Sequence, residues 1–192
     1  MPRMRISLIV PILVFGLVSA FAQLGQPESP PLYNDQDLHF LRHMIVHHQQ
    51  ALDMCALVPA RTGREQFIRF AGYVTRAQAA EIAVMESLLD IAAERGLARP
   101  HHLAGDPPMD GMLSKAQMEA LAAASGAEFE RLWLDGMIYH HEGAIAMARA
   151  QQLQQLKNGR RPYGIDVLVE DILIDQRAEI ARMRAWLKEW GL

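Results

Sequence analysis

A methionine and a pair of adjacent histidines occur twice in this chain inside the same short pattern. The copies span residues 40–54 and 133–147, and both read aromatic-Leu-x-x-Met-Ile-x-His-His-x-x-Ala-x-x-Met. Imidazole binds copper and zinc, whereas thioether sulfur prefers soft ions such as Cu(I). The pattern therefore predicts a metal site, and its sulfur favours copper. The side chains concerned are Met44, His47, His48, Met54, Met137, His140, His141 and Met147.

A second pattern, Gln-x-x-Glu-Ile-x-x-Met, follows each copy of the first. It spans residues 78–85 and 176–183. At helical spacing its Gln, Glu and Met share one face. An unpaired carboxylate on an interior face is costly, so Glu81 and Glu179 need a histidine, an arginine or a cation as partner. This pattern adds Glu81, Met85, Glu179 and Met183 to the candidate metal residues.

Each candidate residue also has an ordinary structural explanation. A methionine on an apolar helical stripe is usually core packing, and an interior histidine is usually hydrogen-bonded. Glu81 and Glu179 could pair with interior histidines without any metal. The recurrence of the whole set, in phase, favours metal binding over these alternatives.

Further soft side chains lie outside the two repeats. The segment between the halves contains His101-His102 and the pair Met109 and Met112, which form an accessory soft site or belong to an ordinary loop. Cys55 falls on the apolar stripe of its helix, and we expect a buried thiol.

Helical periodicity runs through the chain from Asn34 onward, and no segment alternates as a strand would. We expect the first helix to start at Asn34 or Asp35 and to end at Pro59 and Gly63, and Gly126 to separate the short helix from the next one. The other helices are expected at about residues 65–95, 114–124, 128–156 and 165–190.

The duplication predicts how these helices assemble. Each half is a helix hairpin that cannot bury its apolar face alone, and two antiparallel hairpins close into a four-helix bundle. The fold class is therefore all-α, a bundle of two duplicated hairpins plus a short linker helix. We expect one duplicated helical-bundle domain over residues 34–192, with halves at about 34–96 and 114–192.

The first residues form a separate segment. Basic residues precede a mainly apolar run, which ends in the A-x-A cleavage signal Ala20-Phe21-Ala22. This predicts a secretory signal peptide over residues 1–22, cleaved near Ala22, with an uncleaved anchor as the alternative. Residues 23–33 are expected to form a flexible leader. The location expected is periplasmic or secreted, with membrane contact only through the signal peptide.

Charge and cysteine content exclude several functions. The chain has a formal net charge of −3 at pH 7 and becomes more acidic without its basic signal peptide, so it is not an electrostatic nucleic-acid binder. The single cysteine excludes an intrachain disulfide. No serine lies in a nucleophile-elbow pattern, so a nucleophilic hydrolase is not supported.

The motifs resemble the bacterial family called domain of unknown function 305. The matching stretches are residues 40–54, 78–85, 109–114, 126–129, 133–147 and 176–183. The resemblance implies an exported, ferritin-like four-helix bundle and, for some members, copper binding and copper tolerance in the periplasm. At the matching positions it implies the metal residues Met44, His47, His48, Met54, Glu81, Met85, Met137, His140, His141, Met147, Glu179 and Met183.

The two halves differ at some positions of the shared pattern. Gly136 stands where the first copy has His43, and Glu142-Gly143 replaces Gln49-Gln50. We therefore expect that the halves need not bind metal equally.

The predicted function is copper binding and buffering by an exported protein, as Cu(I) or Cu(II), through interior Met and His. A metal-free helical interaction module is the main alternative. A ferritin-like di-metal oxidoreductase is less favoured, because such sites use Glu-x-x-His pairs and about four carboxylates, and only Glu81 and Glu179 face inward here. The expected partners are a metal ion and either a second copy of the chain or a copper-handling protein.

Overall fold

The computed structural model describes residues 32–97 and 109–192. Within these ranges there is no strand, which confirms the predicted all-α class, and no helix has the length and apolar character of a membrane span. The predicted signal peptide, the leader up to residue 31 and His101-His102 lie outside the described residues. The helices are α2 (Asp35–Arg61), α3 (Glu65–Glu94), α4 (Lys115–Ala123), α5 (Gly126–Lys157) and α6 (Ile165–Trp190).

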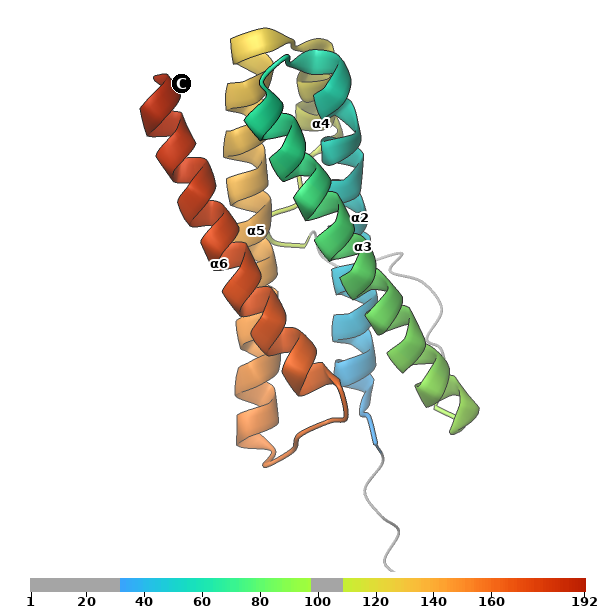
Figure 1. Cartoon of the computed structure of the whole chain (residues 1–192). Coiled ribbons are helices and arrows are strands. Elements are labelled where there is room, and N and C mark those ends of the chain that lie inside the picture. Colours follow the sequence, from blue (N-terminus) through green and yellow to red (C-terminus); the bar gives the residue numbers. More distant parts are fainter. Residues whose placement is uncertain (1–31, 98–108) are drawn as a thin grey trace, which may run out of the picture. The chain divides into compact units, whose positions relative to one another are not determined.

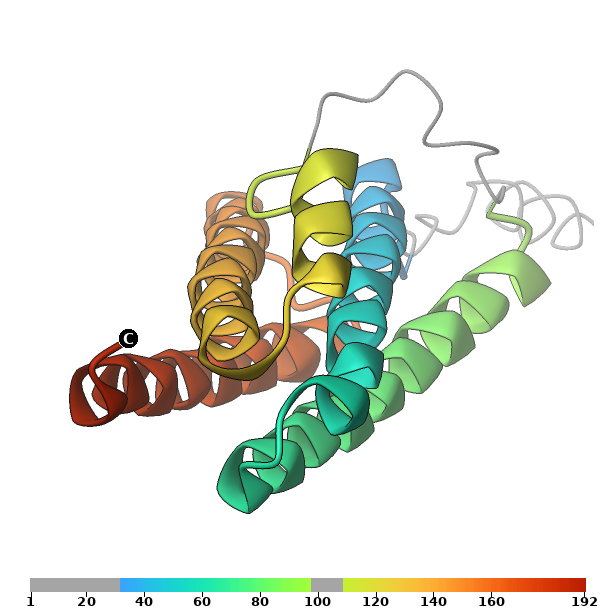
Figure 2. The ribbon, with the colours of Figure 1, turned by 90° about the horizontal axis from the view of Figure 1, so that it is seen from above.

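Two helix hairpins form the bundle. Helix α2 packs along α3 and α5 packs along α6, while α2 and α5 contact each other and join the hairpins. Both α3 and α6 cross this inner pair at an angle (Figure 1). Figure 2 shows that α3 and α6 lie on one side of the inner pair and α4 on the other. The predicted four-helix bundle with a short additional helix is therefore confirmed.

Side chains at the predicted positions begin the helices. The Asn34 side chain accepts a hydrogen bond from the backbone N–H of Asp37 at 2.8 Å, and the Asp37 carboxylate accepts from the Asn34 N–H at 2.9 Å. Ser114 and Gln117 make the same reciprocal contacts at the start of α4. These capping boxes satisfy backbone donors that have no partner within the helix, so they fix where α2 and α4 begin.

One predicted helix boundary is wrong. Pro59 does not end α2, which continues to Arg61; the N–H of Thr62 still donates to the Val58 carbonyl. A proline removes one backbone donor and its ring crowds the carbonyl four residues earlier, but the later N–H groups can still close the last turn. Gly126 is the first residue of α5, and its φ of +59° is left-handed, so this glycine forms part of the turn between α4 and α5 as the sequence predicts.

Aromatic side chains pack the end of the bundle where α3 begins. Phe67 meets Trp133 edge-to-face with ring centroids 4.9 Å apart, and Phe70 meets Trp186 at 5.1 Å. The Trp133 indole N–H donates to the Met54 carbonyl at 3.0 Å. This bond joins α5 to α2, so the repeated aromatic position helps to set the depth at which the two His pairs meet.

Candidate metal centre

The two repeated histidine pairs form a row of imidazoles in the bundle interior. His47 of α2 and His140 of α5 pack against each other with ring centroids 3.8 Å apart and ring planes tilted by 36°. The next rings outward are His48, 6.5 Å from His47, and His141, 6.2 Å from His140. All four side chains have no exposed surface. We call these four rings the imidazole row.

The two central rings lie deeper than helical periodicity predicts. At 100° per residue, the sequence places His47 and His140 on the flank of the apolar stripe of each helix, yet both side chains are fully buried. The Nε2 atom of His47 lies 3.1 Å from the Asp110 carbonyl oxygen, and that of His140 lies 2.9 Å from the His47 carbonyl oxygen. Because a carbonyl oxygen can only accept, each ring carries its hydrogen on Nε2 and its lone pair on Nδ1.

Burial keeps these central rings neutral. The pKa of His47 falls to about 3, chiefly because burial disfavours the imidazolium ion and secondly because of the nearby His48. The pKa of His140 lies well below the ordinary value, again through burial first and then through His47. A neutral imidazole is the form that binds metal ions, so both Nδ1 lone pairs are in a ligating state at neutral pH.

The outer rings of the row pair with the repeated glutamates. The Nε2 of His48 lies 2.7 Å from Glu81 Oε2, and the Nε2 of His141 lies 2.6 Å from Glu179 Oε2. These pairs join α2 to α3 and α5 to α6, and they supply one of the partners that the sequence allows for the two carboxylates. In metal sites a carboxylate on the far nitrogen commonly orients the ligating imidazole.

Polar atoms without a partner are concentrated around the imidazole row. Buried polar groups normally form hydrogen bonds, so this concentration marks a site rather than ordinary core packing. Within the described part of the chain, the side-chain atoms with no hydrogen-bond partner include Nδ1 of His47, His48, His140 and His141, both amide atoms of Gln78 and Gln176, and Oε1 of Glu179.

Each of the helices α2, α3, α5 and α6 has at least one fully buried methionine. Met44 precedes His48 by one turn of α2, and Met137 precedes His141 by one turn of α5, so each pair shares a helix face. Met147 is half-buried. The fully buried methionines are Met44, Met54, Met85, Met137 and Met183.

No three His, Cys, Asp or Glu side chains of residues 32–97 and 109–192 form a group that could hold a metal ion. Zinc sites usually use three or four such ligands, and carboxylate-bridged di-iron sites need about four carboxylates among theirs. The interior instead combines imidazoles with thioethers, which is a donor set that suits copper.

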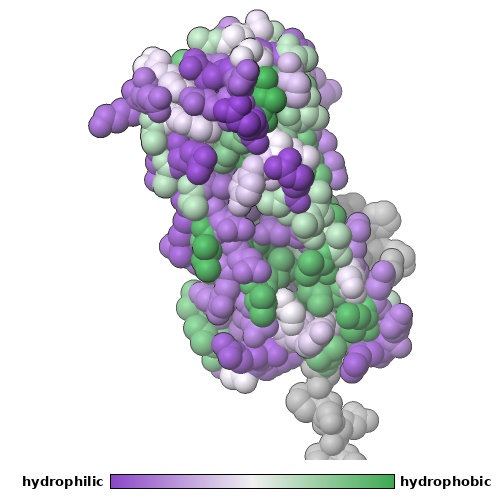
Figure 3. All heavy atoms as spheres, viewed as in Figure 1, coloured by the Kyte–Doolittle hydropathy of each residue, from purple (hydrophilic) through white to green (hydrophobic). Residues whose placement is uncertain are grey.

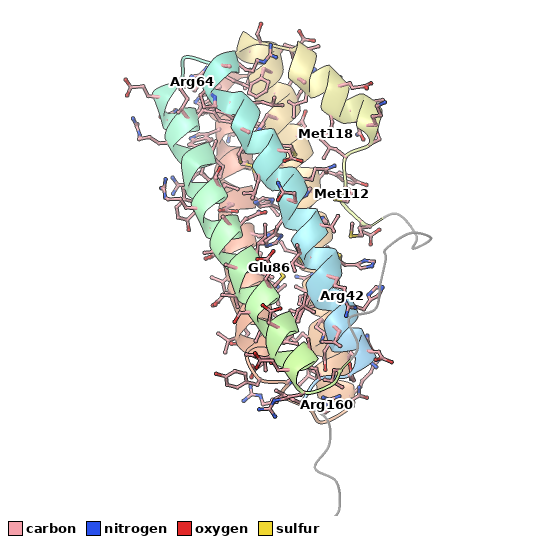
Figure 4. All side chains as sticks on the ribbon, turned by 90° about the vertical axis from the view of Figure 1, so that its right-hand side faces the viewer. Arg42, Arg64, Glu86, Met112, Met118 and Arg160 are labelled. Carbon is pink, nitrogen blue, oxygen red and sulfur yellow. The ribbon has the colours of Figure 1, made fainter. Side chains whose placement is uncertain are left out.

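A short segment before α4 covers the row on one side, and the sequence did not predict this. Gln50 of α2 bonds both backbone groups of Leu113, donating to its carbonyl at 2.9 Å and accepting from its N–H at 2.7 Å. Gly111, with φ of +83°, lies against Gly143 of α5. In Figure 4 Met112 of this segment lies on the side of α2 away from α3. We call residues 109–113 the covering segment.

The difference between the two repeats could have indicated the covering segment. Gln50 and Gly143 occupy equivalent positions of the pattern. The first binds the segment through its amide, and the second gives it room because glycine lacks a side chain. The mismatch between the copies therefore has a structural cause.

A cleft between α3 and α6 lies on the opposite face. A cavity of about 520 Å³ is lined by residues including Phe70, Glu179 and Trp186, and a second of about 880 Å³ by residues including Glu81. Asp175 lines both cavities. Figure 3 shows this face, with apolar side chains gathered around the lower part of the cleft. The two glutamates of the site thus line this cleft.

The family assignment follows from a match that covers most of the chain. The model of the family described as Domain of unknown function (DUF305) matches residues 37–187. The chain belongs to this family. The comparison of the DUF305 chain with curated proteins gives no match.

Solved structures of other DUF305 proteins have the same fold. One from Streptomyces coelicolor is 32% identical over 81% of this chain and 92% of its own, with a TM-score of 0.69. A DUF305 fragment from Deinococcus radiodurans is 29% identical over 81% and 97%, with a TM-score of 0.67. CopM in the Cu(I)-bound form is 28% identical over 80% and 96%, with a TM-score of 0.60. CopM is also known in Cu(II)-bound, Ag-bound and apo forms.

The single cysteine of this DUF305 chain is expected to be unreactive. Burial raises the pKa of the Cys55 thiol to about 12, so thiolate is scarce at neutral pH. We expect iodoacetamide at pH 8 to leave Cys55 unmodified in the native protein and to alkylate it in urea, as measured by intact-mass spectrometry. Alkylation of the native protein at the rate seen in urea would contradict the buried position.

The neutral central histidines predict how the stability of this DUF305 protein depends on pH. His47 titrates at about 3 in the folded state but near 6.5 when unfolded, so between these values only the unfolded chain binds the proton. The stabilisation is complete above pH 6.5 and falls by about 1.4 kcal/mol per pH unit per such histidine below it. Urea unfolding at pH 7.5, 6 and 5 measures this slope.

The variant His47→Gln provides the control for this pH dependence, because an amide N–H can still donate to the Asp110 carbonyl but does not titrate. Below pH 6.5 we expect the unfolding free energy of this variant to change with pH by about 1.4 kcal/mol per pH unit less than that of the wild type, which corresponds to one proton. An unchanged slope would show that His47 is protonated in the folded state.

Proposed function

We propose that this protein is an exported copper-binding protein that buffers or carries copper, chiefly as Cu(I), through the imidazole row and the adjacent thioethers. One observation carries the proposal. Each of the four buried imidazoles has its Nε2 bonded to an oxygen, and its buried Nδ1 has no hydrogen-bond partner among residues 32–97 and 109–192. Rings with one nitrogen fixed and the other unpaired are preorganised for metal binding.

The proposed ligands come from both repeats. The imidazole Nδ1 atoms and the methionine sulfurs bind the ion, while Glu81 and Glu179 orient the outer rings. Thioethers and neutral imidazoles suit Cu(I), and the imidazoles also suit Cu(II). The set is Met44, His47, His48, Met54, Glu81, Met85, Met137, His140, His141, Met147, Glu179 and Met183.

Two further observations support this function. CopM, a relative with the same fold, has been solved in Cu(I)-bound, Cu(II)-bound and Ag-bound forms. The first 22 residues have the pattern of a secretory signal peptide, which supports action in the periplasm or outside the cell.

Titration of the chain that begins at Gln23 tests the proposal. Anaerobic Cu(I) titration against a chromogenic Cu(I) chelator should show tight binding of about one ion per half, and Zn²⁺ should compete poorly because thioethers are weak zinc ligands. If the protein fails to take Cu(I) from the chelator, or binds Zn²⁺ more tightly than Cu(I), the proposal is overturned.

A metal-free interaction module is the second candidate, because the His48–Glu81 and His141–Glu179 contacts form without an ion. The two functions differ in their thermal behaviour. An ion that binds only the folded state must raise Tm. A Tm that stays constant on addition of Cu(I) would favour the metal-free module.

A further inference from the structure

The imidazole row has no surface of its own, so an ion must reach it past other residues. The covering segment closes the row at His47. On the other face, Glu81 and Glu179 each contact an outer ring and also line the cleft between α3 and α6. These two carboxylates therefore connect the cleft with the buried rings.

The cleft has more negative charge than the two glutamates supply. Asp171 and Asp175 of α6 line it together with Glu81 of α3, and Asp175 borders both cavities. The pKa of Asp175 is raised first by burial and then by Glu81, Glu179 and Asp171, so the four carboxylates act on one another. A cation that enters the cleft relieves this repulsion.

One oxygen of a carboxylate that lines the cleft also lacks a partner. Glu179 is only 5% exposed and lines the cavity, and its Oε1 has no hydrogen bond within the described residues, while Oε2 bonds His141. A buried carboxylate oxygen normally accepts hydrogen bonds or binds a cation. This atom points to a positively charged ligand independently of the number of acidic groups nearby.

The arginines that line the same cleft make other contacts. Arg69 donates to Glu65 at 3.0 Å, and Arg161 lies 3.8 Å from Asp166. The Arg182 guanidinium carbon lies 5.9 Å from the centre of the Phe70 ring. None of these contacts is with Glu81, Asp175 or Glu179, so these three arginines do not pair directly with the carboxylates at the centre of the cleft.

We infer that a small cation enters through the cleft between α3 and α6, and that Asp175 draws it toward Glu81 and Glu179. The inference rests on the proposed copper function and assigns a role to a residue outside the ligand set. Asp175 has no acidic counterpart in the first half, where Ala77 precedes the matching Gln78. Because no three carboxylates or histidines of the described ranges form a chelating group, Asp175 acts through its electric field.

The rate of Ag⁺ binding to the chain from Gln23 tests this role. Ag⁺ is a soft monovalent cation, and stopped-flow tryptophan fluorescence in nitrate buffers follows its binding without chloride precipitation. We expect Asp175→Asn to slow binding about threefold at about 10 mM sodium nitrate and to bind as much Ag⁺ at equilibrium. At about 300 mM sodium nitrate the two rates should converge, because salt screens the field.

Asp135→Asn is the matched control. Asp135 is an exposed carboxylate of α5 that lies 3.6 Å from Arg131, so this variant loses the same charge away from the cleft. We expect its binding rate to equal that of the wild type. Equal rates for Asp175→Asn and the wild type, or equal slowing in both variants, would overturn the role of Asp175. Absence of Ag⁺ binding to the wild type would instead overturn the proposed function, and the inference with it.

Discussion

The double variant His48→Ala/His141→Ala should lose tight Cu(I) binding, with Kd raised by more than about a hundredfold. Removing a residue that only orients a ligand already costs up to about a hundredfold in metal affinity, and this double variant removes the proposed ligands themselves. The substitutions remove one buried Nδ1 donor from each half. They also leave both oriented carboxylates without their rings. Anaerobic competition with a Cu(I) chelator measures Kd, and elemental analysis of the dialysed protein measures the amount bound.

The same double variant also affects folding, which calls for a second pair of substitutions. Glu179 is 5% exposed, and a buried carboxylate oxygen left without its hydrogen-bond donor costs about 1–3 kcal/mol or more. Met44→Leu/Met137→Leu keeps side-chain volume and both His–Glu pairs, so it should cost less than about 1.5 kcal/mol each. We expect it to weaken Cu(I) binding about tenfold or more, and Cu(II) binding less, because thioethers prefer the softer ion.

Met118→Leu is the control for the methionine variants. Met118 is a half-buried residue of α4 (Figure 4), on the face of the inner helix pair opposite the cleft. We expect its Cu(I) affinity to equal that of the wild type. Unchanged affinity in both double variants would show that the imidazole row and its thioethers do not bind the ion.

The fold could be predicted because local signals and the repeat agreed. The capping residues Asn34 and Ser114 mark helix starts by chemistry that acts within four residues, and both starts are confirmed. The helix ends were less well predicted. Pro59 was expected to break α2, but a proline close to the end of a helix removes one donor, and the final turn closes past it.

The site was predicted in part. The sequence could not show contacts between residues that are far apart in the chain. Periodicity placed Met44 and His48 correctly on the interior face of α2. It placed His47 and His140 on the flank, because periodicity describes one helix and takes no account of what covers it. His47 is buried partly by Asp110, a residue far away in the sequence. The ligand set itself stays a prediction.

The covering segment gives the second large expected effect. Gly143→Ala should destabilise the protein by about 2–4 kcal/mol, although alanine is the better helix former. A Cβ on Gly143 would meet the Asp110 carbonyl and would lie 2.6 Å from the Cα of Gly111. These are backbone atoms, so no side-chain rotation relieves the overlap. The covering segment must move away from α5, and His47 then loses its Asp110 acceptor.

Gly72→Ala is the control that distinguishes the steric overlap at Gly143 from the effect of alanine on helix propensity. Gly72 also lies inside a long helix, and its added Cβ would meet only the end of Arg76 at an ordinary 3.6 Å. We therefore expect this variant to gain about 0.5–1 kcal/mol. Urea unfolding of both variants measures the difference, and a gain of stability in Gly143→Ala would show that the covering segment does not lie against α5. If the segment holds His47 in its ligating form, Gly143→Ala should also weaken Cu(I) binding, whereas Gly72→Ala should not.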